Sequence, residues 1–235
     1  MTELAQRLKA RFFRPEDHPY RIFEREVDRF LKGDHTLLDA GCGRTAPVLS
    51  KYRGKARRLV GVDVVEFDPS VAGVELLQSD LAHMSVDDRC VDLVMARSVM
   101  EHLADPLSVY REAHRVMKPG GHFIFLTANL WDYASLIAKI VPNRLHPWIV
   151  SKTEGRAEQD VFPVQYRTNT YGAVRRCAER SGFDIVSFRY LGQYPNYFMF
   201  NGLLFLIATG YEKIISNLDA LRILRGWILA VLRKP

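Results

Sequence analysis

The sequence predicts an α/β fold with a doubly wound, mostly parallel sheet of seven strands. Two observations lead to this prediction. Short apolar runs alternate along the chain with segments of helical periodicity. The first three runs each lead to an acid, namely Asp39, Asp63 and Asp80. Alternating β and α units place helices on both faces of a parallel sheet, and ligands then bind outside the carboxyl ends of its strands. The three acids therefore indicate a nucleoside-binding edge.

The expected elements follow in chain order. Residues 1–33 are expected to form helices interrupted at Pro15 and Pro19, since residues 20–31 carry apolar side chains at helical spacing and Gly33 follows. Helices are also expected directly after Gly43, over 107–117 and over 170–181. The expected strands cover residues 37–39, 59–62, 74–77, 91–96, 121–126, 183–190 and 227–232.

Composition narrows the class of protein. The 235 residues are 48% hydrophobic and 26% charged, which suits one globular domain over 1–235 with a substantial core. The net charge of +6 is spread along the chain without a basic stripe interleaved with aromatics, so nucleic-acid binding is not expected. The three cysteines lack metal-ligand spacing and the first residues lack an apolar signal segment. No metal site and a cytoplasmic location with reduced thiols are therefore expected.

A cluster of motifs between residues 37 and 126 resembles the class I S-adenosylmethionine-dependent methyltransferases that act on small molecules. The first motif of this family is an acid followed by Gly-x-Gly-x-Gly after one residue, and here it begins at Asp39 as DAGCGRT, with Thr45 in place of the third glycine. VDLV at 91–94, MEHL at 100–103 and RVMKPGG at 115–121 follow in the family's order. The resemblance returns more weakly over 166–190 and at the terminal WILAVLRKP.

The resemblance implies a Rossmann-like sheet and S-adenosylmethionine as the cofactor. In that family, glycines such as Gly41 and Gly43 let the backbone approach the amino-acid end of the cofactor. The acid at Asp63 binds the ribose hydroxyls, the one at Asp80 contacts the adenine amino group, and Asp39 is placed to attract the ammonium group. The expected cofactor-binding residues are Asp39, Gly41, Cys42, Gly43, Asp63, Val64, Asp80, Leu81 and Arg97.

Two other functions fit part of the same pattern. Gly41-x-Gly43-x-x-Ala46 with Asp63 downstream also matches the dinucleotide fingerprint of NAD-dependent oxidoreductases. Against that alternative, Asp39 would repel a pyrophosphate and Asp80 would have no role. A catalytically inactive cofactor-binding scaffold is the second alternative. Three of these residues also have a purely structural interpretation. Cys42 suits packing in a tight turn, and Asp92 and Glu101 suit capping or surface positions.

The resemblance points to two candidate acceptor-side regions. Methyl transfer is an in-line displacement, so the protein mainly orients the acceptor, but a hydroxyl acceptor still needs a proton sink. His102 is the leading catalytic candidate, because the turn after the fourth strand lies beside the reacting methyl in this family, and His83 is the second. Tyr166 and Arg167 are expected to hold an acceptor hydroxyl or acidic group. Structural loop roles, with Thr168 or Asn169 as a helix N-cap, are the alternative.

Two apolar insertions, at 130–165 and 195–222, do not fit the alternating scheme. The apolar part of the second, residues 197–215, is too short to span a membrane, and pairing of the strands on either side of it would require the chain to return to the same side. A lid over an apolar pocket, an interfacial helix, a dimer surface or extra core packing are all consistent with these segments. A small apolar, lipid-linked or glycan-linked acceptor is expected, with peripheral contact at the inner face of the membrane and a homodimer both left open.

Overall fold

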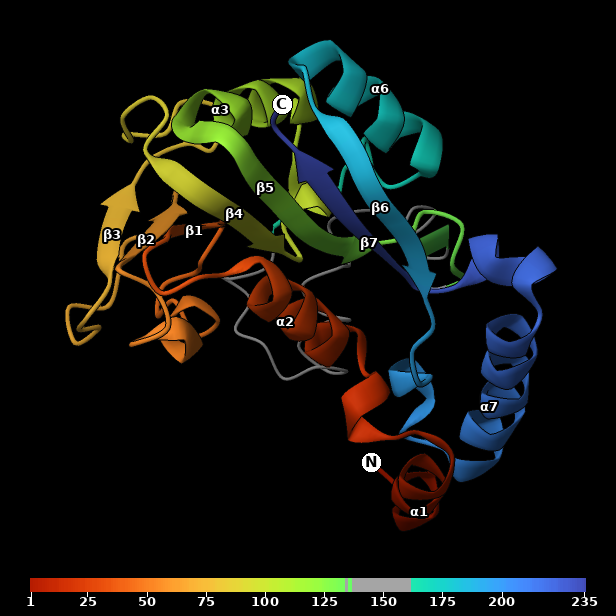
Figure 1. Ribbon diagram of the computed structural model, residues 1–235. Coiled ribbons are helices and arrows are strands. Elements are labelled where there is room, and N and C mark those ends of the chain that lie inside the picture. Colours follow the sequence, from red (N-terminus) through yellow and green to blue (C-terminus); the bar gives the residue numbers. More distant parts are fainter. Residues whose placement is uncertain (134, 137–161) are drawn as a thin grey trace.

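A seven-stranded sheet forms the centre of the computed structural model, which describes residues 1–133, 135–136 and 162–235 (Figure 1). The strand order is β3-β2-β1-β4-β5-β7-β6. The pairs from β3 to β5 are parallel, and β7 is antiparallel to both of its neighbours. The predicted fold class, a mostly parallel doubly wound sheet, is confirmed.

Every apolar run that was predicted to form a strand does form one. The strands are β1 (Thr36–Ala40), β2 (Arg58–Asp63), β3 (Glu75–Gln78), β4 (Val91–Arg97), β5 (Met117–Ala128), β6 (Asp184–Leu191) and β7 (Trp227–Arg233). The largest difference is at β5, which begins before the expected residue 121. Met117 pairs with Val91 on β4, so the Lys118-Pro119-Gly120 turn belongs to the strand as an irregularity.

The helices begin at capping side chains in the expected regions. They are α1 (Glu3–Phe12), α2 (Pro19–Phe30), α3 (Pro106–Val116), α6 (Tyr171–Ser181) and α7 (Gly202–Asn217). Short 3-10 turns cover Pro15–Asp17, Leu49–Tyr52, Met100–His102, Asn196–Phe198 and Asp219–Leu224. The alternative role of Thr168 or Asn169 as the N-cap of α6 is wrong, because the Thr170 side chain accepts from the Ala173 N–H while Thr168 and Asn169 are buried.

The helix expected directly after Gly43 is also absent. The chain instead makes a turn followed by the 3-10 turn Leu49–Tyr52. Pro47 explains the difference, since a proline disfavours the right-handed helical conformation of the residue before it and has no N–H to donate. Ala46 accordingly has a positive φ of 43°.

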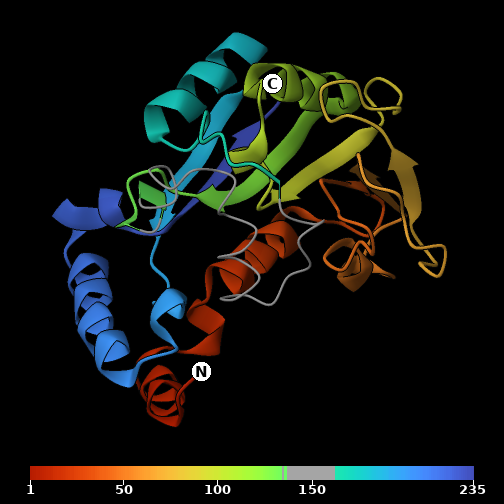
Figure 2. The same ribbon diagram turned by 180° about the vertical axis from the view of Figure 1, so that it is seen from behind.

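Helices cover both faces of the sheet (Figure 2). α3 and α6 pack on one face, where Tyr110 and Val174 are fully buried. α2 and the Leu49–Tyr52 turn pack on the other, where Phe23 and Val27 are fully buried. Burial of one such side chain contributes about 1.5–3 kcal/mol. The apolar face predicted for the 20–31 helix is therefore the face that anchors α2 to the sheet.

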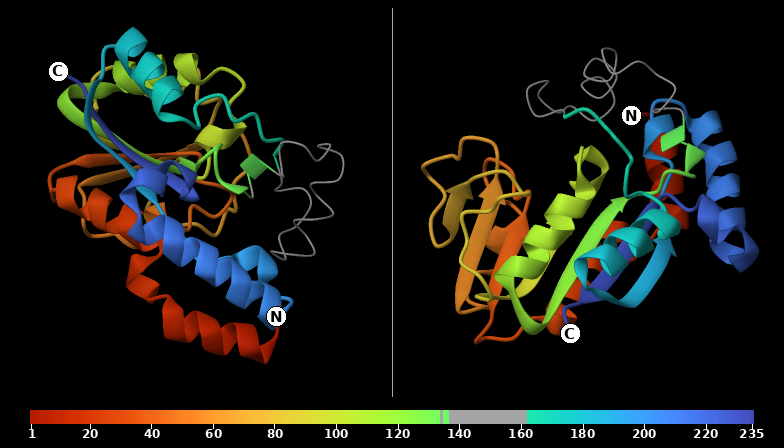
Figure 3. Two further views of the ribbon diagram at one scale, coloured as in Figure 1. Left: turned by 90° about the vertical axis from the view of Figure 1, so that its right-hand side faces the viewer. Right: turned by 90° about the horizontal axis from the view of Figure 1, so that it is seen from above.

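α1 and α7 lie side by side beyond the edge of the sheet (Figure 3). They share a small core of Ala5, Met199 and Phe205. The 192–226 segment that carries α7 leaves from β6 and returns at β7, at the edge where β4 and β5 also end. The Asn129 side chain, just after β5, closes this edge by donating to the carbonyls of Ile223 and Arg225 at 2.6 and 2.7 Å.

Part of the first insertion, residues 134 and 137–161, lies outside the described residues. Its predicted role as a lid or interfacial surface therefore has no structural description. None of the described helices combines the length and the apolar composition that a membrane span requires.

Candidate functional site

The glycine turn after β1 is attached to the end of β2 by backbone hydrogen bonds. The Gly41 N–H donates to the Val62 carbonyl at 2.8 Å, and the Gly43 N–H donates to the Asp63 carboxylate at 2.7 Å. Both glycines have positive φ, but for different reasons. A Cβ on Gly41 would lie 2.2 Å from Cγ2 of Val99, whereas a Cβ on Gly43 would meet no heavy atom within 4 Å. Gly41 thus permits close packing, and the space beside Gly43 is open to a ligand.

Asp63 ends β2 beside this open space. Its carboxylate also accepts from the Val65 N–H at 3.3 Å, so it fixes the turn that follows the strand. A carboxylate has about four acceptor positions, and two remain for ligand hydroxyls after these bonds. Val64 is half exposed, and its carbonyl accepts from the Gln78 side chain at 3.0 Å. Asp63 and Val64 therefore form one wall at the carboxyl ends of β2 and β3.

Asp39 is a buried acid on β1 with an unsatisfied oxygen. Burial raises the pKa of its carboxyl group to about 7, the Arg97 guanidinium opposes this shift, and Asp63 adds to it. Among the described residues, none donates to its Oδ2 atom. A buried acceptor without a donor is costly unless a ligand satisfies it. A cationic group would do so and would also lower the pKa of this carboxyl group.

Arg97, the last residue of β4, connects this acid to α2. Its guanidinium lies over the Tyr20 ring at 4.3 Å and 3.8 Å from the Glu24 carboxylate. The Tyr20 hydroxyl lies 3.4 Å from the Ser98 hydroxyl in the turn after β4. These contacts hold α2 against the carboxyl end of β4. Sequence reasoning included Arg97 but gave no sign of its contacts with Tyr20 and Glu24.

Cys42 has the surroundings of a packing residue. It is 4% exposed, and its sulfur lies 2.7 Å from the position that a Cβ on Gly61 would occupy. Burial raises the pKa of its thiol, so the group stays protonated and unreactive. Its backbone N–H donates to the Val62 carbonyl at 3.3 Å. Through that bond, Cys42 helps to fix the glycine turn.

The residues after β3 form an exposed turn. The Asp80 carboxylate accepts from the Ala82 N–H at 2.8 Å, and the Asp80 carbonyl accepts from the His83 N–H at 3.0 Å. Leu81 is buried in the core beneath. The Asp80 carboxylate faces solvent and has room for another donor. The exposed His83 imidazole makes no hydrogen bond or ion pair with any described residue, so its predicted role stays a prediction.

His102 lies in the 3-10 turn after β4 and contacts the segment that begins at residue 162. Its Nδ1 atom is 3.1 Å from the Pro163 carbonyl, and its ring centroid is 6.3 Å from that of Phe162. A carbonyl can only accept, so Nδ1 carries a hydrogen, and in the neutral ring Nε2 keeps a lone pair. This tautomer leaves Nε2 able to take a proton.

Glu101 is a residue whose importance the sequence did not reveal. Its side chain is buried and accepts from the Thr127 hydroxyl at 2.7 Å, and Asn169 donates to the same hydroxyl at 2.8 Å. The Glu101 carbonyl accepts from the N–H groups of Gln165 and Tyr166 at 2.7 and 3.0 Å. The turn after β4, the end of β5 and the 165–169 segment are therefore one hydrogen-bonded unit. Only long-range contacts reveal it, so sequence spacing gave no signal.

This unit positions the predicted substrate-side pair. Tyr166 has a positive φ of 52°, which an L residue adopts only when its surroundings hold it there. Burial raises the pKa of its phenol, while a hydrogen bond with Ser135 opposes the shift. The hydroxyl is thus a proton donor at neutral pH. Arg167 is exposed and has no ion pair among the described residues.

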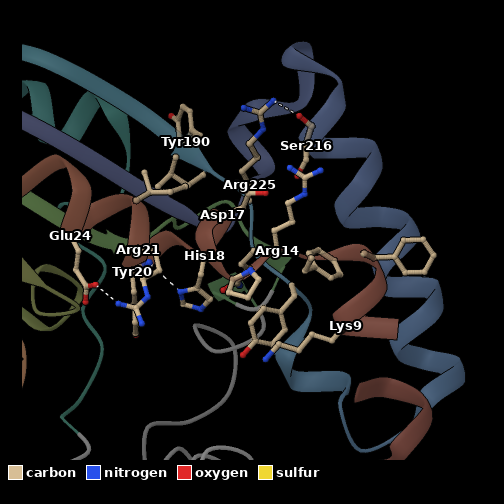
Figure 4. Close-up of a pocket in the computed structure, with 18 of the residues that line it drawn as sticks. Lys9, Arg14, Asp17, His18, Tyr20, Arg21, Glu24, Tyr190, Ser216 and Arg225 are labelled. Atoms are coloured by element: carbon tan, nitrogen blue, oxygen red, sulfur yellow. Dashed lines mark hydrogen bonds and ion pairs between the residues drawn. The ribbon is translucent and has the colours of Figure 1, made fainter. Parts of the chain in front are cut away.

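A cavity of about 620 Å³ has Arg97 in its lining. Figure 4 shows other residues that line it, among them Lys9, Tyr20 and Glu24. Its walls come from the N-terminal segment through α2, from the loop after β6, and from α7 with the turn that follows it. Tyr20, Arg97 and Tyr194 line it, whereas the glycine turn and His102 do not. The structure thus brings the glycine turn, Asp63 and Arg97 together, and it places a separate hollow next to them on the side of β6.

Comparisons with known proteins agree with this geometry. Residues 38–125 match the family described as "Methyltransferase domain". The Ubiquinone biosynthesis O-methyltransferase of Serratia proteamaculans is 31% identical over 131 residues, which are 48% of this chain and 54% of that protein. Its counterpart in Pseudomonas paraeruginosa is 34% identical over 119 residues, 45% of this chain and 49% of that protein. The chain therefore spans about half the length of the curated relatives it matches.

Solved structures share the fold over nearly the whole chain. An S-adenosylmethionine-dependent methyltransferase from Mesorhizobium loti has a TM-score of 0.61 at 16% identity, with 93% of this chain and 99% of that one covered. The geranyl diphosphate C-methyltransferase of Streptomyces coelicolor A3(2) has a TM-score of 0.54 at 16% identity, with 92% and 81% covered. The fold, the matched domain and the sequence relatives agree: residues 38–125 resemble a methyltransferase domain, and nearly the whole chain shares the fold of a solved S-adenosylmethionine-dependent methyltransferase.

Proposed function

We propose that this protein binds S-adenosylmethionine at the carboxyl ends of β1 to β4 and transfers its methyl group to a small acceptor molecule. One observation carries the proposal. The glycine turn is hydrogen-bonded to Asp63 beside open space at Gly43, and the buried Asp39 carboxyl next to it has an oxygen without a donor. An adenosyl group with a cationic amino-acid end supplies the hydroxyls and the ammonium that these groups lack.

The residues present fit this cofactor. Asp63 would accept from the ribose hydroxyls, Asp80 from the adenine amino group, and Asp39 would pair with the ammonium group. Gly43 leaves room for the amino-acid end, Val64 offers apolar surface near the base, and Leu81 packs beneath this turn. The cofactor supplies an activated methyl group and its own leaving group. The chain then has to exclude water, orient the acceptor and accept a proton.

For an acceptor hydroxyl we propose His102 as the proton sink, with Tyr166 and Arg167 on the acceptor side. The Nδ1 contact with the Pro163 carbonyl supports this, because it leaves the lone pair on Nε2. The Glu101 network supports it further, since it fixes Tyr166 next to the same turn. The sequence relatives named as O-methyltransferases favour an oxygen acceptor.

We further propose that the acceptor is apolar, lipid-linked or glycan-linked. α7 supports an apolar or lipid-linked one, because it turns an apolar face outward, with Leu203 65%, Ile207 64% and Ile214 56% exposed. A contiguous exposed apolar face of this kind is typical of a contact surface. Peripheral membrane contact and dimer formation both stay proposals, and sedimentation with liposomes and equilibrium ultracentrifugation would distinguish them.

The decisive experiment is calorimetry of the purified protein with S-adenosylhomocysteine and, separately, with NAD. Binding of the first and no binding of the second is the expected result, and the reverse would indicate an NAD-dependent oxidoreductase. Transfer of a radiolabelled methyl group to a cell-extract fraction then separates an enzyme from an inactive scaffold. Folded protein that binds neither compound would refute the proposed function.

A further inference from the structure

We infer that the cavity beside Arg97, which His102, Tyr166 and Arg167 do not line, binds the part of the acceptor remote from its reacting group, and that this part is an amphipathic anion, that is, a carboxylate or phosphate group on an apolar body. This inference deepens the proposed function and rests on it. The argument uses the charge balance of the cavity, its aromatic walls and its position next to the glycine turn.

The first observation is an excess of positive charge. Only two carboxylates, Asp17 and Glu24, line the cavity within the described residues. The cationic lining residues are Lys9, Arg14, Arg21, Lys51, Arg97, Lys213 and Arg225. A hollow with low-dielectric walls and one sign of charge concentrates its electric field and attracts a ligand of the opposite sign.

At one end of the cavity, the carboxylate of Glu24 is already paired with cationic side chains. Glu24 receives Arg21 at 2.8 Å and Arg97 at 3.8 Å, and it also pairs with Lys51. Three cations therefore share one carboxylate. The resulting cluster lies at α2 and carries net positive charge.

The other end has cations without acidic partners in the cavity. Lys9 lies over the Tyr194 ring at 3.8 Å, and Arg14 has no ion pair with any described residue. Lys213 donates to the Phe12 carbonyl at 2.6 Å, which fixes α7 to the N-terminal segment. Lys9 and Arg14 are thus the charges that an incoming anion can engage without breaking an existing ion pair.

The pKa of His18 reflects the same excess of positive charge. Burial lowers the pKa of its imidazole, and the charges of Lys9, Arg97 and Arg21 lower it further. Its Nδ1 atom accepts from the Tyr20 N–H at 3.2 Å, which requires a lone pair there. A neutral histidine at the centre of a cationic wall agrees with a positive local potential.

The second observation is the aromatic lining. Phe12, Phe13, Tyr20, Tyr190 and Tyr194 contribute rings to the cavity. The Phe13 and Tyr194 rings are 6.2 Å apart and tilted, a packing that leaves a rigid apolar surface. Ligand sites typically combine such apolar walls with a few charged groups. A purely inorganic anion would leave these walls uncovered, so the ligand needs an apolar body.

The third observation is position. Arg97 lines the cavity and also acts on the Asp39 carboxyl group at the proposed cofactor site. Tyr20 lines it and reaches Ser98, whose neighbour Val99 packs against Gly41. A ligand in the cavity would therefore lie beside the residues at the end of β4 that neighbour the glycine turn.

The test uses the full-length protein saturated with S-adenosylhomocysteine and three probes: farnesyl phosphate, farnesol and inorganic phosphate. Farnesol has the same body without the charge, and inorganic phosphate has the charge without the body. The test variant is Lys9→Gln with Arg14→Gln. The matched control is Arg7→Gln with Arg11→Gln, because these residues lie on or beside the same helix, lose the same charge and do not line the cavity.

Farnesyl phosphate is expected to bind at least about tenfold more tightly than either other probe. The test variant should lose about tenfold in that affinity, and the control should stay within about twofold. Equal loss in both variants, or equal binding of farnesol, would overturn the inference. If the Lys9→Gln, Arg14→Gln variant retains binding and a Leu203→Ser, Ile207→Ser variant loses it, the probe binds at the α7 face. That result would also overturn the inference.

Failure of the inference is distinguishable from failure of the proposed function. Protein that binds S-adenosylhomocysteine but not farnesyl phosphate leaves the cofactor site intact and removes the anionic acceptor. Folded protein that does not bind S-adenosylhomocysteine removes the proposed function itself. Circular dichroism of both double variants checks that each is folded.

Discussion

The buried carboxyl group of Asp39 makes the stability of the free protein and its cofactor affinity depend on pH. Burial raises the pKa of this group from 3.8 to about 7, so the folded state favours its neutral form. The stabilising contribution of the neutral form is therefore complete only below the unfolded pKa of 3.8, and it is lost progressively as the pH rises from there through about 7. Asp39→Asn keeps the shape and removes this ionisation.

The magnitude follows from proton linkage. With a pKa of 3.8 in the unfolded chain and about 7 in the folded protein, the free energy of unfolding is lower than at acid pH by about 4 kcal/mol once the group is ionised in both states. At pH 5 this loss is only about 2 kcal/mol, because the group is ionised in the unfolded chain but still neutral in the folded protein. The free energy of unfolding of Asp39→Asn relative to the parent should thus rise by about 2–3 kcal/mol between pH 5 and pH 8.

Urea denaturation of both proteins at a series of pH values measures this difference. Asp92→Asn is a control of opposite sign. Burial would raise the pKa of Asp92, but its ion pair with Lys118 and its hydrogen bond from the Thr36 N–H lower it overall. That variant should lose stability relative to the parent as the pH rises through the range where Asp92 ionises. A stability difference for Asp39→Asn that does not change with pH would refute the assignment of a raised pKa.

Cofactor binding gives a second measurement of the same group. If the ammonium end of the ligand pairs with ionised Asp39, binding releases a proton at pH values below 7. The affinity of the parent for S-adenosylhomocysteine should fall by up to about tenfold per pH unit below 7. Asp39→Asn should bind more weakly and without this dependence. Calorimetry in buffers of different ionisation enthalpy would detect the released proton, and its absence would place the ammonium group elsewhere.

Four further predictions concern single residues in and around the turns of the site. Gly41→Ala should lower the free energy of unfolding by about 2 kcal/mol or more in thermal melts, since its Cβ has no room and its φ is positive. Gly43→Ala should cost about 1–2 kcal/mol through φ, while its main effect should be weaker S-adenosylhomocysteine binding in calorimetry. His102→Ala should lower turnover by about 10²–10⁴-fold with little change in cofactor affinity, and equal turnover would remove it from the proton-transfer role. Thr127→Val should cost about 1–3 kcal/mol in urea denaturation, because Glu101 then loses a buried donor.

Local sequence signals predicted the strands well and the turns poorly. β2 and β4 are short apolar runs with polar residues at their ends, and such runs have few alternatives to a buried parallel strand. The helix expected after Gly43 failed because Pro47 imposes a local conformational restriction on Ala46 that apolar periodicity does not register. The N-cap of α6 was not predicted at Thr170, because Thr168, Asn169 and Thr170 are equivalent in sequence and only packing decides which two are buried.

The candidate site divides in the same way. Asp39, Gly41, Gly43 and Asp63 were predictable, because their order and spacing along the chain reflect short connections between neighbouring strands. The network of Glu101 with Thr127 and Asn169 was not, since it joins residues that lie up to 68 positions apart in the numbering. Interactions of that kind leave no periodic trace in one sequence.

The sequence by itself determined the class of fold, the strand ends that carry acids and the glycine turn, because each depends on residues close together in the chain. Only the tertiary structure decided which charges are buried and which cations meet in one cavity. α1, α2, β6 and α7 come together at the carboxyl edge of the sheet through contacts between distant segments. The raised pKa of Asp39 and the positive cavity beside Arg97 are properties of that assembly, because burial and electrostatic potential depend on all surrounding atoms.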